Sequence, residues 1–106
     1  MAASYDDLTG QTTGQLINVS TTYVEVHSSA AKEVVEVIAN NPNAAAELVT
    51  VKVDSASGGT AKEKVIRIPA YEDRRLFKGT LSASAQKVFV KTATNTVGVS
   101  GQFRSF

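Results

Sequence analysis

The chain has 106 residues and a mass of 11.2 kDa, which predicts one small domain and excludes a two-domain enzyme. Its 11 basic and 10 acidic side chains nearly cancel, so the charge balance gives no attraction to nucleic acid or to anionic lipid. The sequence has no cysteine and one histidine, which excludes disulfides and a cysteine nucleophile, and we expect no cofactor and no bound metal.

Residues 1–14 are small, polar and punctuated by glycine, with Tyr5 and Leu8 as apolar anchors. This composition predicts an N-terminal arm that lies outside the core. We expect Tyr5 and Leu8 to insert into an adjacent subunit. Deletion of residues 1–14 should then leave the remaining domain, residues 15–106, folded.

From Gln15 onward, short runs rich in Val and Ile alternate with turn residues at intervals of about ten, which is typical of an all-β sandwich or barrel. Residues 49–53 are the clearest example, because valine alternates with polar residues and so gives one buried and one wet face. We predict a single antiparallel β-sandwich, Ig-like or jelly-roll. The candidate strands are 16–19, 22–27, 33–39, 49–53, 64–68, 74–78, 87–91 and 96–103.

Two of these strands carry more specific expectations. In the strand at 22–27, alternation places Val24 and Val26 inward and Tyr23, Glu25 and His27 outward. In the strand at 33–39, apolar residues occupy both parities, which favours a central strand covered on both faces.

Turn residues separate the predicted strands. The sequence Asn40-Asn41-Pro42-Asn43 should end the strand at 33–39, because Asn tolerates left-handed dihedrals and Pro fixes φ. Residues 44–48 could form one helical turn after Pro42. Residues 55–60 should be a hairpin loop around two glycines, and Pro69 should close the strand at 64–68.

Few residues suggest reactive chemistry. His27 has no second histidine near it in the sequence, so we expect a structural or solvent-exposed role. Asp6 and Asp7 lack the further carboxylates that a cation loop supplies, and no serine lies in a nucleophile elbow. We therefore predict that the protein is not an enzyme.

Two groups of charged side chains each allow two interpretations. Residues 72–75 should form a turn of self-compensated charge, with a subunit contact through Arg74 and Arg75 as the alternative. The lysines on or beside strands could form a basic stripe or protect the sheet edges from aggregation; they are Lys62, Lys64, Lys87 and Lys91.

The last residues, 103–106, place two aromatic rings close together. Exposed aromatic area gives an isolated monomer little stability, so we expect Phe103, Arg104 and Phe106 to contact another subunit.

One further pattern extends over most of the chain, from about Gln15 to Gln102. It consists of 38–41 after a Val-rich strand, 48–53, 68–72, 76–79, Leu81, 88–93 and 97–101. In strand order and turn residues, this pattern resembles a loose group of small all-β virion proteins encoded by tailed bacteriophages.

The resemblance implies a virion component assembled in the host cytoplasm, present in several copies or as a homo-oligomer. Its expected partners are major capsid, neck or tail subunits, with no nucleic acid and no membrane. Head decoration or cementing is the first expectation, and a neck or tail post in head-tail connection or fibre attachment is the alternative. Two rivals are a carbohydrate- or host-surface-binding module and a cytosolic adaptor that adds a strand to partner peptides.

Overall fold

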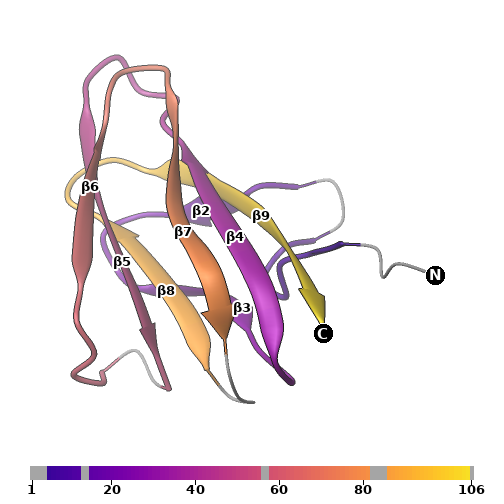
Figure 1. Ribbon diagram of the computed structural model, residues 1–106. Helices are drawn as coiled ribbons and strands as arrows, with labels where there is room; N and C mark the ends of the chain where they lie inside the picture. The colour runs from indigo at the N-terminus through magenta and orange to yellow at the C-terminus, as the bar shows by residue number, and fades with distance from the viewer. Residues whose placement is uncertain (1–4, 13–14, 56–57, 82–85, 106) are drawn as a thin grey trace.

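The computed structural model describes residues 5–12, 15–55, 58–81 and 86–105, and within these ranges the chain forms nine strands and no helix (Figure 1). The strands are β1 (Asp6–Asp7), β2 (Ile17–Val19), β3 (Val24–Ser28), β4 (Glu33–Asn40), β5 (Glu47–Asp54), β6 (Lys64–Ile68), β7 (Asp73–Leu81), β8 (Lys87–Thr92) and β9 (Val97–Ser105). The all-β prediction is confirmed. Each of the eight candidate strands is present, and the two-residue strand β1 is additional.

The strands form two antiparallel sheets. In sheet A, β1 and β2 both pair with β9, and the order continues through β4 to β7. In sheet B the order is β3, β8, β5, β6. Valines from both sheets meet in one core, so the molecule has two layers, as a sandwich does.

The pairing is nested along the chain. β5 pairs with β6, β4 with β7, β3 with β8 and β2 with β9, so each pair encloses the previous one, like two legs of one long hairpin. Two lateral pairings, β4 with β9 and β5 with β8, join these pairs into the sheets. The nesting places β6 and β7 at matching edges of the two sheets (Figure 1).

Period-two alternation determines which side chains enter the core. In β4, buried and half-buried residues alternate strictly, with Glu33, Val35, Val37 and Ala39 buried. Residues of the other parity, such as Ile38, are only half-buried, so the expectation that both faces of this strand are covered is wrong. The reason is that β4 is central within sheet A, but sheet B covers only one face of it.

The segment at residues 5–12 lies against the domain, contrary to the expected arm. β1 pairs with β9 through Asp6 opposite Phe103, and Leu8 is 1% exposed within the core. The backbone N–H of Gly10 then donates to the carbonyl oxygen of Val26 in β3, at 3.0 Å. A Cβ atom at Gly10 would lie 2.8 Å from a β3 carbonyl oxygen, so the approach requires glycine.

The predicted ends of two strands are confirmed, because β4 ends at Asn40 and β6 ends at Ile68, just before Pro69. Residues 56 and 57 of the predicted loop at 55–60 lie outside the described residues. The buried amide of Asn41 donates to the carbonyl oxygens of Ala45, Ile68 and Pro69 at 2.9 to 3.2 Å. This amide joins the β4–β5 turn to the β6–β7 turn. Residues 44–48 form no helical turn, because β5 already begins at Glu47.

Candidate functional site

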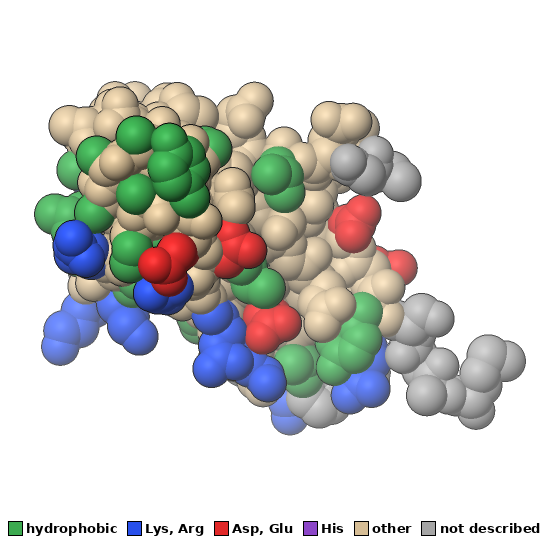
Figure 2. Space-filling model, turned by 90° about the horizontal axis from the view of Figure 1, so that it is seen from above, with side chains coloured by type: hydrophobic (Ala, Val, Ile, Leu, Met, Phe, Trp, Pro, Cys, Tyr) green, Lys and Arg blue, Asp and Glu red, His purple; other side chains and the backbone are tan. Residues whose placement is uncertain are grey.

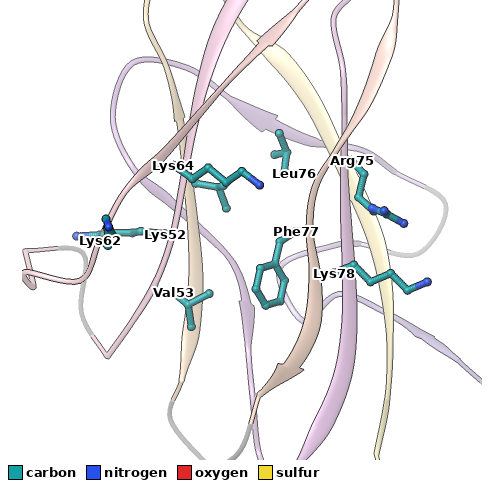
Figure 3. A pocket seen from close by; sticks show the side chains of 9 residues that line it. Lys52, Val53, Lys62, Lys64, Arg75, Leu76, Phe77 and Lys78 are labelled. Atoms are coloured by element: carbon teal, nitrogen blue, oxygen red, sulfur yellow. The ribbon is translucent and has the colours of Figure 1, made fainter.

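The candidate site is a hollow between β6 and β7. A cavity of about 600 Å³ separates β5 and β6 of sheet B from β7 of sheet A (Figure 3). We call it the β6–β7 slot, and its lining residues are Val51, Lys52, Val53, Lys62, Lys64, Arg75, Leu76, Phe77 and Lys78. No other described strand pairs with the outer edge of β6 or of β7.

Apolar side chains form the inner walls of the slot. Val53 from β5 and Phe77 from β7 project into it (Figure 3). Both are half-buried and pack against the core. A bulge in the β4–β7 register lies at Leu76, so that Leu76 and Phe77 both turn inward although they are consecutive. The core is therefore partly open along this side.

Lys64 is the charged side chain that points into the slot. It lies opposite Val51 in the β5–β6 register, on the inward parity of β6, and Figure 3 shows it reaching toward β7. By the same alternation, Val65 and Arg67 lie on the outer face of sheet B. An inward-pointing charge at an exposed edge discourages pairing with apolar strands.

The slot is surrounded by cations. Five of its nine lining residues are Lys or Arg, and none is acidic. Arg75 lies 3.5 Å from Glu36, and Lys52 lies 3.9 Å from Asp54. Within the described residues, Lys62, Lys64 and Lys78 have no carboxylate within ion-pairing distance. Seen from the end that carries the β6–β7 turn, Lys and Arg gather along one margin of the molecule (Figure 2).

Three of the expected contact residues near the chain ends, Tyr5, Phe103 and Arg104, have partners within the domain. The guanidinium of Arg104 lies 5.2 Å from the ring centre of Tyr5, and the Phe103 ring lies 4.5 Å from that of His27. The expectation that Leu8 inserts into another subunit is wrong, because Leu8 fills the core of its own domain. Phe106 lies outside the described residues.

The predicted turn at residues 72–75 is wrong in its bounds, because Arg74 and Arg75 already belong to β7, but ion pairs still balance the charge of both arginines. Arg74 pairs with Glu72 at 2.8 Å, and Arg75 pairs with Glu36 of β4. Both arginines are exposed, and Arg75 also lines the slot. A subunit contact through them stays a prediction.

His27 is fully buried, which alternation alone did not predict. A bulge between Glu25 and His27 shifts the parity of β3, so Val26 and His27 are both inside. The backbone N–H of Thr9 donates to Nδ1 at 3.2 Å, which leaves the proton on Nε2, 2.7 Å from a carboxylate oxygen of Glu33. His27 therefore has the structural role that the sequence suggested: it holds residues 8–10 onto the domain.

A second buried carboxylate, Glu47, organises the β8–β9 turn. Its oxygens accept the backbone N–H groups of Ala93, Thr94 and Asn95 at 2.9 to 3.0 Å, and also the Thr94 hydroxyl. Burial raises the pKa of Glu47, but these hydrogen bonds outweigh burial, and the pKa lies below its ordinary value. The role is structural, because every donor belongs to the same turn.

Tyr23 covers part of the outer face of sheet B. Burial and the hydrogen bond to the Glu63 carboxylate, with its charge, raise the pKa of Tyr23 well above the ordinary value of 10.0. The ammonium groups of Lys52 and Lys91 lie 4.8 and 4.6 Å from its ring centre. These cation–π contacts stabilise both lysine ammonium groups on this face.

The β6–β7 turn carries the most exposed of the large hydrophobic side chains described. Tyr71 is 70% exposed and has φ 60°, a left-handed conformation that bulky residues rarely adopt. The hydrogen bond from the backbone N–H of Asn41 to the carbonyl oxygen of Glu72 holds the turn beside the β4–β5 turn. The ring therefore stands away from the domain.

Neither a metal centre nor a membrane helix is found in the described ranges. They contain no group of three His, Cys, Asp or Glu side chains placed to hold a metal ion. They also contain no helix that could cross a membrane. Comparisons with models of protein families, with characterised proteins and with solved structures each gave no match.

Proposed function

We propose that the chain is a non-enzymatic structural protein of a tailed-bacteriophage particle, bound in many copies to neighbouring capsid subunits as a head decoration or cement protein. The resemblance of residues 15–102 to small virion proteins supports this proposal. Attachment at the neck or tail is the alternative location. Either location requires a compact domain with exposed faces for neighbouring subunits, and a near-zero net charge lets copies lie close together.

The observation that carries the proposal is the nested strand pairing. We infer that the fold is a jelly roll, because rolling one long hairpin gives the sheet orders β2-β9-β4-β7 and β3-β8-β5-β6. In an Ig-like sandwich the first two strands share a sheet, whereas here β2 and β3 lie in different sheets. Jelly rolls recur in viral capsid domains and in lectins.

The contact surface follows from what is exposed. Tyr5 remains 47% exposed beside Arg104, and Arg74 and Arg75 are exposed at the start of β7. We propose these exposed residues as contacts to neighbouring subunits. Leu8 has no part in them.

Purified particles test the proposal. Particles from the host strain that carries the coding sequence should contain the protein in many copies by quantitative mass spectrometry, and immunogold labelling should locate it on heads. A host cytosolic protein of similar size serves as the purification control. Labelling of necks or tails would select the alternative location, and absence from purified particles would contradict the virion assignment.

A carbohydrate-binding function is the second candidate, and Tyr71 favours it. An exposed aromatic ring beside acidic and amide side chains suits sugar recognition, and Glu72 and Asn43 lie on the adjoining turns, with Asn40 at the end of β4. Glycan-array binding that disappears in the Tyr71→Ala variant would support this function. Binding that the variant retains would remove Tyr71 from it.

A further inference from the structure

The β6–β7 slot combines two free strand edges with an exposed strip of core. β6 offers five residues of unpaired edge and β7 offers nine, because within the described residues each pairs with one neighbour only. Unpaired edges are templates on which an extended peptide adds a strand. Between these edges, Val53 and Phe77 are only half-buried. An added strand could therefore place apolar side chains against them.

The charge of the slot selects the chemistry of that strand. Lys64 points inward, and no described carboxylate pairs with it. A purely apolar strand would bury this ammonium without a partner, which is costly. A strand that carries a carboxylate at this position would pair with Lys64 instead. Lys62 and Lys78 add positive charge at the rim.

Nucleic acid fits the slot less well. Proteins that bind single strands stack bases on exposed aromatic faces. Phe77 is the aromatic residue among the lining residues, and it packs against the core. The free backbone edges match a peptide, whose N–H and C=O groups can continue the ladder.

We propose that the β6–β7 slot binds an extended acidic segment of a partner protein. The segment adds a strand to the free edge of β7, rests an apolar side chain against Val53 and Phe77, and places a carboxylate on Lys64. This binding depends on the slot alone, so it is tested with the purified protein and is independent of the virion assignment.

The probe is a labelled peptide as long as β7 with the repeat Val-Thr-Glu-Thr, so that Val and Glu alternate along one face of the added strand, measured by fluorescence anisotropy at low salt. We expect binding, weakened by roughly tenfold or more in the Lys64→Glu variant. Arg67→Glu is the matched control, because Arg67 lies on the same strand, is exposed, and faces away from the slot. Arg67→Glu makes the same change in net charge, and we expect it to lower the affinity for the peptide by less than about threefold.

Three outcomes would overturn the proposal. The first is no binding of the peptide to the folded protein. The second is an equal loss in both variants, which would show attraction to net charge alone. The third is tighter binding of a single-stranded oligonucleotide than of the peptide. In hydrogen exchange, bound peptide should slow exchange of β7 amides, which attraction to charge alone would not do.

Discussion

The two sides along which the edges of sheet A and sheet B face each other differ in whether a segment of the chain joins the sheets. On one side, residues 5–12 join the sheets, because β1 pairs with β9 of sheet A while Thr9 and Gly10 bond to β3 of sheet B. On the other side, β6 and β7 are joined by their turn at one end and leave the slot between them. We call these the closed side and the open side. The difference shows that a few extended residues can join the two sheets along one side, and that no described segment does so along the other.

The largest expected effect tests the seal of the closed side. Leu8→Ala should lower the free energy of unfolding by about 2–5 kcal/mol, because it leaves a cavity in the core. Leu16, which is 52% exposed, is the control, and Leu16→Ala should cost less than about 1 kcal/mol. Urea denaturation measures both variants. Equal effects would show that residues 5–12 do not seal the core, as would an unchanged stability after deletion of residues 1–12.

Glu33 tests the polar part of the same seal. Glu33→Gln should cost about 1–3 kcal/mol, because it removes the charged partner of buried His27. Hydrogen exchange at the amides of Thr9 and Gly10 should also become faster. Glu36→Gln, on the outer face of the same strand, should change stability by less than about 0.5 kcal/mol. Unchanged exchange at the Thr9 amide would show that the pair of His27 and Glu33 does not hold residues 8–10 onto the domain.

Glu47 provides a reference away from both sides. Since its pKa is lowered on folding, its contribution is complete above the ordinary pKa of 4.5 and is lost as the pH falls through the lower, folded value. Glu47→Gln should cost about 1–2 kcal/mol at neutral pH. The difference in free energy of unfolding between the variant and the unaltered protein should become smaller as the pH falls. Urea titrations across this pH range measure it, and a constant difference would contradict the lowered pKa.

The smallest effect on stability is expected on the open side. Lys64→Met should leave the free energy of unfolding almost unchanged, because Lys64 is exposed. It should however promote self-association, since an inward charge no longer protects the edge. Sedimentation velocity at several concentrations measures this, with Arg67→Met as the control. Equal self-association of the two variants would show that Lys64 does not protect the sheet edge.

The sequence predicted the parts of the fold that depend on local pattern. Alternation located the strands, and Asn40 to Asn43 and Pro69 located two turns. It failed where an extra residue shifts parity, as at the β3 bulge that turns His27 inward. It also failed at Leu8, because a strand of two residues has no periodicity to detect, and its burial depends on a distant partner.

The candidate site was visible only in part. Lys64 was noted as one of several lysines near strands, and its inward parity follows from the alternation of 64–68. The slot itself depends on which edges remain unpaired, and that is a property of sheet order. A pattern along the chain does not determine sheet order, because sandwiches of different topology share the same alternation.

The position of β9 has a consequence for biosynthesis. β9 lies inside sheet A, between β2 and β4, although it is made after both of them. Until β9 has left the ribosome, sheet A therefore lacks an interior strand and exposes the edges of its neighbours. Chains whose contacts link residues distant in sequence fold slowly, and such intermediates are prone to aggregate. We expect native structure to form only after release of β9 from the exit tunnel, with chaperones binding the nascent chain until then.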